Sequence, residues 1–232
     1  MSAVVGVVLF PGSNCEHDVI QAVESFGASA RICWHQEASL AGVDAVVLPG
    51  GFAHGDYLRP GAIARFSPVM GAVARAAADG VPVLGICNGF QVLTEAGLLP
   101  GALTRNAGLR FVCATVPCVV ASTASVLTSG AHVGDVLELP VNHGEGRYVC
   151  DARTLAELRA EGRIVLRYAS DVNGSLDQIA GIANASGNVV GLMPHPERAS
   201  SPLTGSADGR VLLASFLRAA ARTGSLLGAP VA

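Results

Sequence analysis

Short runs of apolar, mostly β-branched residues alternate along this chain with alanine-rich stretches in which apolar positions recur with helical period. This alternation predicts an α/β fold in which a mostly parallel central sheet carries helices on both faces. The expected strands cover residues 4–10, 29–34, 44–48, 81–86, 164–168, 179–184 and 189–193. The expected helices cover residues 16–26, 61–78, 88–96 and 209–222.

The segment from residue 110 to residue 139 departs from this pattern, because it is rich in valine and threonine and has turn residues between short apolar runs. Such a pattern is typical of antiparallel strands, and we expect it to form an edge region of the sheet. No linker, low-complexity segment or internal repeat divides the sequence. The interpretation is therefore a single domain over residues 1–232.

The composition excludes several kinds of function. The 232 residues are half apolar and carry a net charge of −3 without a basic run, so we expect neither nucleic acid nor a membrane as a partner. All fifteen basic side chains other than histidine are arginine, which excludes a lysine-containing phosphate-binding loop and a Schiff-base mechanism. If the reaction uses ATP, a different chain is expected to bind it.

The cysteines and the amino-terminal residues indicate a compartment. The six cysteines show no Cys-x-x-Cys spacing, and a chain with this apolar content does not need disulfide bonds, so we expect reduced thiols. The amino-terminal residues lack a basic stretch, and no apolar run approaches the roughly twenty residues that span a bilayer. The protein is therefore expected to be cytoplasmic.

Candidate chemistry centres on Cys87. An apolar strand runs into Gly85-Ile86-Cys87-Asn88-Gly89, and a helix is expected to follow. Glycines on both sides permit a tight strand-to-helix turn that holds the central residue at positive φ and displays its side chain. Unpaired N–H groups at a helix N-terminus favour the reactive thiolate. Taken alone, the pattern fits a nucleophile and a buried structural cysteine about equally well.

A histidine with a nearby carboxylate is the base that a cysteine nucleophile needs. His195 and Glu197 follow the expected strand 189–193, and an extended backbone would place both on one side. His143 with Glu145 is an alternative pair that the spacing does not exclude; we prefer His195 because it directly follows a strand. The remaining histidines show no metal-ligand spacing, so local or surface contacts and no metal site are expected for them. They are His17, His35, His54 and His132.

Two further segments follow or separate predicted strands, where open α/β sheets place their ligands. Gly50-Gly51-Phe52-Ala53-His54-Gly55-Asp56 can bring backbone N–H groups close to a ligand, so this loop and the N–H of Asn88 are candidates for an oxyanion hole. A plain strand-to-helix connection would also explain the glycines. The second segment is dense in polar groups and suits a small polar substrate. It reads Asn142-His143-Gly144-Glu145-Gly146-Arg147-Tyr148.

Together these segments resemble the class I glutamine amidotransferases, in which a Cys-His-Glu triad hydrolyses glutamine. The resemblance rests on Gly-Ile-Cys-Asn-Gly-Phe-Gln at 85–91 and Pro-His-Pro-Glu-Arg at 194–198. A narrower resemblance, to glutaminase subunits of phosphoribosylformylglycinamidine synthases, extends in order over residues 10–198. It rests on Phe-Pro-Gly-Ser-Asn-Cys at 10–15, Leu-Pro-Gly-Gly-Phe at 48–52, Gly-Asp-Tyr-Leu-Arg at 55–59, the segment 142–148, Asn-Gly-Ser at 173–175 and Ile-Ala-Gly-Ile at 179–182.

The resemblance implies a flavodoxin-like amidotransferase architecture and specific roles. Cys87 would attack the side-chain amide of glutamine, and His195 would relay protons with the support of Glu197. Gly51 and Asn88 would supply the oxyanion N–H groups. The residues implied to hold glutamine are Gly50, Phe52, Gln91, Asn142, His143, Gly144 and Glu145.

The resemblance also implies that this chain uses no cofactor of its own. Ammonia would pass to a large synthetase subunit, often accompanied by a small third subunit. That synthetase would use ATP and Mg²⁺ to aminate formylglycinamide ribonucleotide in purine biosynthesis. The sequence departs from the family pattern at Ala53-His54, Pro60 and Asn142, which concern the rim of the site more than the triad.

Three alternatives fit parts of the pattern. A glutaminase serving a GMP or CTP synthetase would share the triad, but the segments 10–15 and 142–148 argue against it. A cysteine hydrolase of the PfpI/DJ-1 type would share the elbow, but it places histidine directly after the cysteine, where this chain has Asn88. A regulatory module that has lost the chemistry would lack a triad residue, and all three are present.

Overall fold

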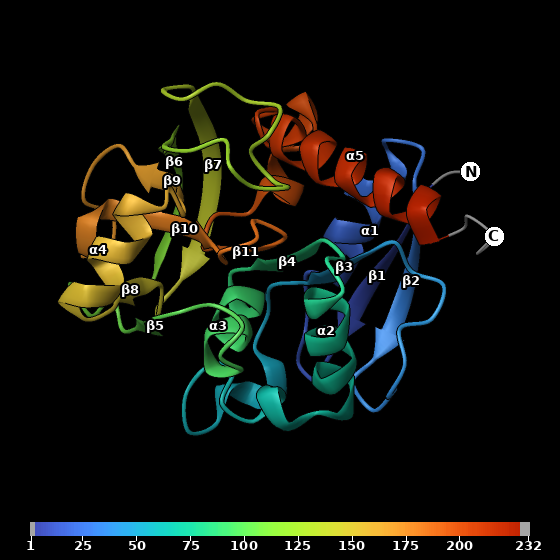
Figure 1. Cartoon of the computed structure of the whole chain (residues 1–232). Helices are drawn as coiled ribbons and strands as arrows, with labels where there is room; N and C mark the ends of the chain where they lie inside the picture. Colours follow the sequence, from blue (N-terminus) through green and yellow to red (C-terminus); the bar gives the residue numbers. More distant parts are fainter. Residues whose placement is uncertain (1–2, 228–232) are drawn as a thin grey trace.

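The computed structural model describes residues 3–227 and is built on a nine-stranded mixed sheet (Figure 1). The strand order is β2-β1-β3-β4-β11-β10-β9-β6-β7. These strands are β1 (Val4–Leu9), β2 (Ser29–Trp34), β3 (Ala45–Leu48), β4 (Val83–Ile86), β6 (Val112–Val120), β7 (Val136–His143), β9 (Ile164–Tyr168), β10 (Ile179–Ala183) and β11 (Val189–Leu192). A small second sheet pairs β5 (Ala102–Thr104) with β8 (Arg147–Val149).

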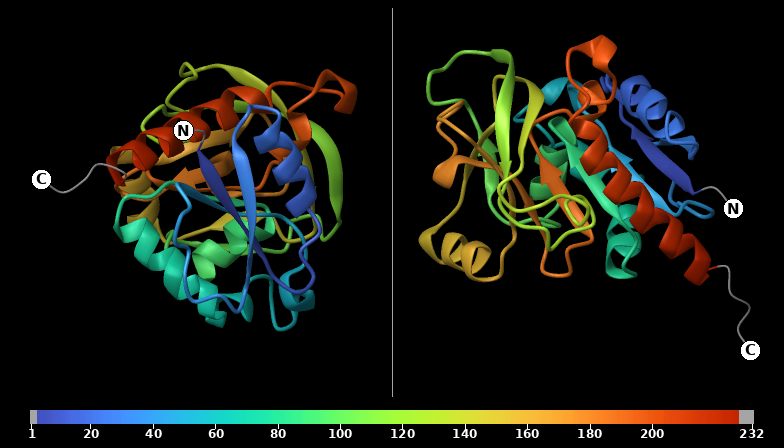
Figure 2. Two further views of the ribbon diagram at one scale, coloured as in Figure 1. Left: turned by 90° about the vertical axis from the view of Figure 1, so that its right-hand side faces the viewer. Right: turned by 90° about the horizontal axis from the view of Figure 1, so that it is seen from above.

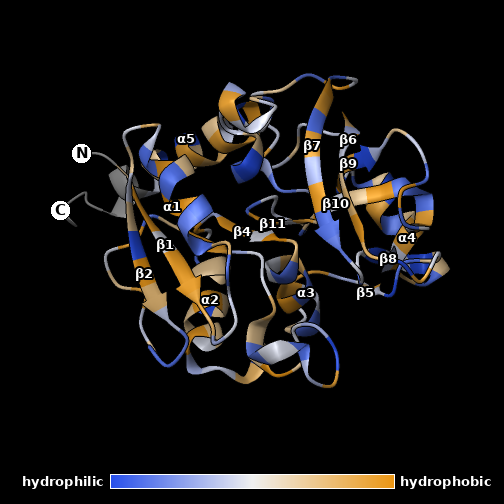
Figure 3. Cartoon of the chain, turned by 180° about the vertical axis from the view of Figure 1, so that it is seen from behind, coloured by the Kyte–Doolittle hydropathy of each residue, from blue (hydrophilic) through white to orange (hydrophobic). Residues whose placement is uncertain are grey.

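The sheet changes from parallel to antiparallel along its width. β2, β1, β3, β4 and β11 run parallel, whereas the pairings from β11 through β10, β9 and β6 to β7 are antiparallel. The predicted α/β class with an antiparallel edge region is therefore confirmed, and this region includes β9 and β10. Strands covered on both faces are apolar throughout, which explains why β3, β4 and β11 are buried at every position. Figure 3 shows the same preference in β1, which is hydrophobic over most of its length.

Helices cover both faces of the sheet (Figure 1, Figure 2). α1 (Glu16–Glu24) and α5 (Gly209–Leu227) pack on one face, and α2 (Pro68–Ala78) and α3 (Asn88–Glu95) pack on the other. The apolar pattern does not predict α4 (Ala152–Ala160) or the β5–β8 sheet. Within residues 3–227, no helix combines the length and apolar character needed to cross a lipid bilayer.

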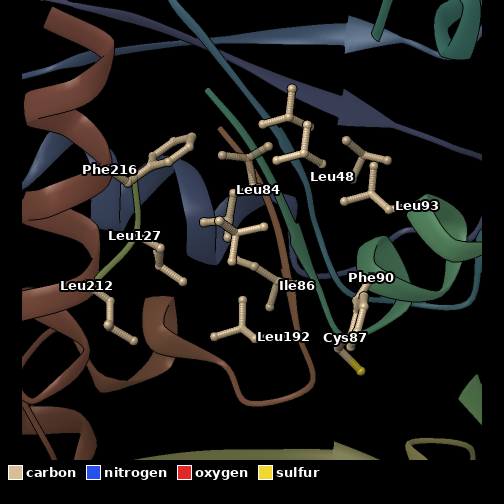
Figure 4. Close-up of a cluster of buried hydrophobic side chains, with 14 of the residues drawn as sticks. Leu48, Leu84, Ile86, Cys87, Phe90, Leu93, Leu127, Leu192, Leu212 and Phe216 are labelled. Carbon is tan, nitrogen blue, oxygen red and sulfur yellow. The ribbon is translucent and has the colours of Figure 1, made fainter. Parts of the chain in front are cut away.

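The core lies on both sides of the central strands (Figure 4). Leu212 and Phe216 of α5 pack toward one side of Leu84, and Phe90 and Leu93 of α3 lie toward the other. All five side chains are buried. The core therefore fixes α3, and with it the end of β4, against the sheet.

The predicted helix over residues 61–78 is wrong in its first part. The α-helix begins at Pro68, and Ala64–Phe66 form a separate 3-10 turn. Ser67 is extended, because proline disfavours the helical conformation in the residue before it. Proline itself fits the first helical position, because an N–H group there would have no partner within the helix. The connection from β3 to α2 is consequently a long irregular segment, which forms one wall of the pocket described next.

Candidate active site

Cys87 lies at the junction of β4 and α3, where its backbone adopts φ 50° and ψ −105°, a strained conformation for a residue with a Cβ atom. The flanking glycines make this turn possible. A Cβ at position 85 would lie 2.7 Å from the Gly89 backbone, and one at position 89 would lie 1.9 Å from the Leu48 carbonyl oxygen. The predicted strand-to-helix elbow is confirmed, and Figure 4 shows Cys87 at its tip.

His195 follows β11, and the parallel pairing of β11 with β4 brings it to the same sheet edge as Cys87. His195 Nδ1 lies 2.6 Å from Glu197 Oε1, and both side chains are almost completely buried. The two groups meet because Glu197 lies in the 3-10 turn Pro196–Ala199, and not because the backbone is extended as expected. The predicted pairing is therefore correct, but the local geometry expected for it is not.

Glu197 controls the ionisation of His195. Burial by itself lowers the pKa of this imidazole, but the negative charge of Glu197, with a contribution from Cys87, raises the pKa to about 10. His195 Nε2 has no hydrogen-bond partner among the described residues. Since Nδ1 is committed to Glu197, Nε2 is the nitrogen that can exchange a proton with a molecule bound beside Cys87.

His143, the alternative base, has a different environment. Its Nδ1 lies 3.2 Å from Asn106 Oδ1, and the Asn106 amide nitrogen donates to the His143 carbonyl oxygen at 3.0 Å. Burial, together with the charge of His195, lowers the pKa of His143 to about 4. Glu145, its proposed carboxylate partner, instead approaches Arg105 at 3.5 Å. His143 is thus a neutral imidazole at pH 7, and the geometry favours His195 as the base.

A pocket of about 260 Å³ lies over Cys87, a volume that suits a ligand the size of an amino acid. It brings together most of the residues that the sequence analysis singled out. Its lining consists of Asn14, Cys15, Gly51, Phe52, Asp56, Pro60, Cys87, Gln91, Phe111, Asn142, His143, Gly144, Glu145, His195 and Arg198. The carbonyl oxygen of Asn142 lies 3.8 Å from Cys87 Sγ, so the polar segment 142–145 borders the nucleophile directly.

Three predicted site residues, Gly50, Asn88 and Glu197, lie behind this lining. Gly50 has to be glycine, because a Cβ there would lie 2.8 Å from His195 Cε1. Within the described residues, neither the Gly51 N–H nor the Asn88 N–H donates a hydrogen bond to another group. The neighbouring Phe52 N–H is occupied by the Gly12 carbonyl oxygen at 3.0 Å. The predicted oxyanion donors are therefore unpaired.

Cys15, Asp56 and Arg198 also line the pocket. The sequence predicts Asp56 only as the end of the glycine-rich loop and predicts no site role for Cys15 or Arg198. Each lies in a segment that resembles the family, at 10–15, 55–59 and 194–198, so the resemblance was the signal that could have identified them. Ligand atoms of Cys15, His195 and Glu197 lie within 4.8 Å of one another, an arrangement that could in principle hold a metal ion.

Two observations argue against a cation at that cluster. Arg198 donates a hydrogen bond of 3.1 Å to Cys15 Sγ, which places a positive charge against the sulfur. Burial raises the pKa of Cys15 to about 12, although Arg198 opposes the shift, so this thiol stays protonated at neutral pH. Cys15 is therefore better suited to a structural hydrogen bond than to metal binding or nucleophilic attack.

Asp56 should reduce stability at neutral pH. Burial raises its pKa to about 6, a hydrogen bond from Asn88 opposes the shift, and the charge of Glu145 adds to it. The folded protein therefore binds the Asp56 proton more tightly than the unfolded chain, and its stability falls as the pH rises from about 4 to 6. Asp56→Asn should raise the melting temperature at pH 8 and leave it unchanged at pH 4. The melting temperature is measured by circular dichroism at both pH values. An equal increase at pH 4 and pH 8 would indicate a packing effect instead.

Comparisons with known proteins agree with this geometry. Residues 2–210 match the CobB/CobQ-like glutamine amidotransferase domain. The chain is 57% identical over 216 residues to phosphoribosylformylglycinamidine synthase subunit PurQ of Rubrobacter xylanophilus, covering 93% of this chain and 98% of the relative. It is 58% identical over 208 residues to the same subunit of Mycobacterium bovis, covering 90% and 93%.

Solved structures give the same result. PurLQS from Thermotoga maritima contains a chain that is similar with a TM-score of 0.87 and 42% identity, covering 94% of this chain and 99% of that one. The glutaminase domain of CTPS from Trypanosoma brucei has a TM-score of 0.61 at 17% identity, covering 95% and 94%, and so shares the fold alone. The chain belongs to the CobB/CobQ-like glutamine amidotransferases and, among them, to the PurQ subunits of phosphoribosylformylglycinamidine synthase.

Proposed function

We propose that this chain hydrolyses glutamine and supplies the ammonia for phosphoribosylformylglycinamidine synthesis. The observation that carries the proposal is the position of Cys87, held at positive φ in a pocket that also contains the buried His195–Glu197 pair. A cysteine, a histidine and a carboxylate in this arrangement are a nucleophile, a general acid–base and the group that orients it. The match to a glutamine amidotransferase domain supports glutamine as the substrate.

The reaction proceeds in two steps. The Cys87 thiolate attacks the side-chain amide carbon of glutamine, and the resulting oxyanion accepts hydrogen bonds from the Gly51 and Asn88 N–H groups. His195 Nε2 donates a proton to the amide nitrogen, the C–N bond breaks, and ammonia leaves a glutamyl thioester. Water then attacks the thioester while His195 accepts its proton. Glutamate leaves and the Cys87 thiolate is restored.

The His195–Glu197 pair suits the first proton transfer. With a pKa of about 10, the imidazole is protonated at neutral pH, so a proton is already in place when the amine departs. Glu197 holds Nδ1 and stabilises the positive charge, which leaves Nε2 directed to the reaction. The two charges interact strongly because both side chains are buried, so that solvent does not screen one from the other.

We assign glutamine binding to the segment 142–145 together with Phe52 and Gln91, which line the pocket, and to Gly50 behind it. The Glu145 carboxylate is 31% exposed in side-chain area, so it can meet the α-ammonium group of a free amino acid. His143 Nε2 is an acceptor without a partner among the described residues. These acceptors favour a free amino acid over a peptide-linked glutamine, whose nitrogen carries no charge.

The ammonia acceptor in this proposal is a PurL-type synthetase, which uses ATP and Mg²⁺ and is accompanied by a small third subunit. The similar chain from Thermotoga maritima was solved in PurLQS, which supports such an assembly. The absence of lysine is consistent with ATP binding on another subunit. Catalysis by this chain needs no metal or cofactor of its own.

Exposed apolar side chains support a synthetase-binding surface at the mouth of the pocket. Phe52 and Phe111 line the pocket yet are 50% and 55% exposed. Leu58 and Leu109 flank them in sequence, are 89% and 79% exposed, and adopt positive φ values of 71° and 52°. Holding leucine side chains in solvent on a strained backbone costs free energy. A partner that covers these side chains can offset that cost. A synthetase at this mouth would receive ammonia without its loss to water.

Glutamine hydrolysis should therefore depend on the partner. Adding the PurL-type subunit with its nucleotide and substrate should raise ammonia release by about tenfold or more, which corresponds to about 1.4 kcal/mol in the barrier. Leu58→Asp should weaken this stimulation while the basal rate is unchanged, because the side chain faces solvent in the isolated chain. Full activity without a synthetase, unchanged by its addition, would favour a stand-alone hydrolase.

A further inference from the structure

The loop from Gly51 to Asp56 carries one of the two oxyanion donors, yet its backbone is strained. His54 and Asp56 adopt φ values of 54° and 53°, in the left-handed region that favours glycine. Phe52, in the same loop, is half exposed, so burial of its side chain does little to hold the loop in place. Contacts from outside the loop must therefore keep the Gly51 N–H in its position. Backbone hydrogen bonds from Phe52 and His54 to the carbonyl oxygens of Gly12 and Pro11 hold one side of the loop.

The side chain of Asn88 makes such contacts. It is 2% exposed, its Oδ1 accepts a hydrogen bond from the Ala53 N–H at 3.0 Å, and its Nδ2 donates to Asp56 Oδ1 at 3.0 Å. The two bonds attach to the middle and the end of the strained loop. Asn88 itself lies at the first position of α3, directly after the nucleophile.

The same amide extends the connection across the pocket. Asn88 Nδ2 also donates to Gln91 Oε1 at 2.9 Å, and Gln91 Nε2 donates to the Glu145 carbonyl oxygen at 2.5 Å. One chain of hydrogen bonds therefore joins the loop 51–56, the elbow and the segment 142–145. These three segments form most of the pocket lining.

We propose that the Asn88 side chain is a positioning residue that locks the glycine loop to the nucleophile elbow. One residue would then supply an oxyanion N–H from its backbone and fix, through its side chain, the loop that supplies the other. Asp56 is the anchor on the loop side, and Gln91 carries the restraint to the substrate-binding segment. The inference rests on the proposed glutaminase function and adds a role for a side chain that makes no contact with the reacting atoms.

The test uses variants that keep the backbone N–H of residue 88. Asn88→Ala should lower kcat for glutamine-dependent amination in the assembled complex by about tenfold or more. Removal of one oxyanion donor lowers kcat by about 10²–10³, and a displaced donor should lose part of that effect. KM for glutamine should change by less than about threefold. Ammonia-dependent amination, which does not use this site, should remain at the wild-type rate.

A donor–acceptor exchange separates positioning from general stability. Asn88→Asp keeps the acceptor for Ala53 but replaces both donors and places a second carboxylate beside Asp56, so kcat should fall. Adding Asp56→Asn restores a hydrogen bond between the two positions with the donor on the other side, and kcat should recover in part. Asp56→Asn alone keeps an acceptor for Asn88, so its kcat should lie above that of Asn88→Asp.

Asn188→Ala is the matched control. Asn188 is 6% exposed and its Nδ2 donates to the carbonyl oxygens of Ala77 and Val81 at 2.9 and 3.0 Å, at the opposite end of β4. Its loss should lower the melting temperature without lowering kcat. Wild-type kcat in Asn88→Ala, or no recovery in the exchange variant, would overturn the inference. A wild-type complex that releases no ammonia from glutamine would instead refute the proposed function.

Discussion

Replacing Cys87 with alanine should abolish glutamine-dependent amination by the assembled complex and leave ammonia-dependent amination intact. Only the thiolate can form the glutamyl thioester, so the loss should reach a factor of about 10⁴ or more. The synthetase site does not involve this residue in our proposal and should accept added ammonia at the wild-type rate. Both rates are measured on the same preparation with glutamine or an ammonium salt as the nitrogen source.

The other cysteines provide the controls. Cys113 is exposed, and Cys113→Ala should retain full glutaminase activity. A glutamine analogue with an electrophilic side chain should label Cys87 alone, even though Cys15 lines the same pocket. Labelling of Cys15 in place of Cys87, or equal loss of both nitrogen sources in Cys87→Ala, would contradict the assignment of the nucleophile.

The second large effect is expected at His195. His195→Ala should reduce glutamine-dependent amination as strongly as the loss of Cys87, because the members of a triad act as a unit. Glu197→Gln should leave measurable activity, since the amide can still orient the imidazole but cannot stabilise its charge. Single-turnover measurements of thioester formation would separate the two variants from a defect in binding.

His143→Ala is the matched comparison, because both histidines line the pocket and both have an Nε2 without a partner among the described residues. His143 is neutral and has no carboxylate partner within residues 3–227, so its loss should raise KM for glutamine more than it lowers kcat. If the His143 variant were inactive at saturating glutamine and the His195 variant were active, the two roles would have to be exchanged.

Much of this site could be predicted from the sequence because its chemistry depends on short local patterns. The glycines at positions 85 and 89 predict close backbone contacts around Cys87 that leave no room for a side chain. The structure contains these contacts. His195 and Glu197 are close in sequence, so almost any turn between them allows contact. The choice between His195 and His143 could not be made from spacing, since it depends on burial and on Asn106.

The features that the sequence did not predict include contacts between segments that are far apart in the chain. Asp56 and Asn88 meet only when the loop after β3 folds over the start of α3, and no periodic pattern encodes that contact. The start of α2 was misplaced because alanines before Pro68 resemble a helix, although the proline prevents Ser67 from continuing one. α4 was missed because it buries little apolar surface, and only Leu158 in it is buried.

The pairing of β11 with β4 has a consequence for the newly made chain. Cys87 follows β4, which is synthesised early, whereas His195 and Glu197 follow β11, the last strand within residues 3–227. β11 lies between β4 and β10, so the sheet is continuous only after this late segment has entered it. A nascent chain that ends before β11 is expected to carry the thiol without a base. Ammonia release would then begin only when the domain is complete, which protects cellular glutamine from unfinished protein.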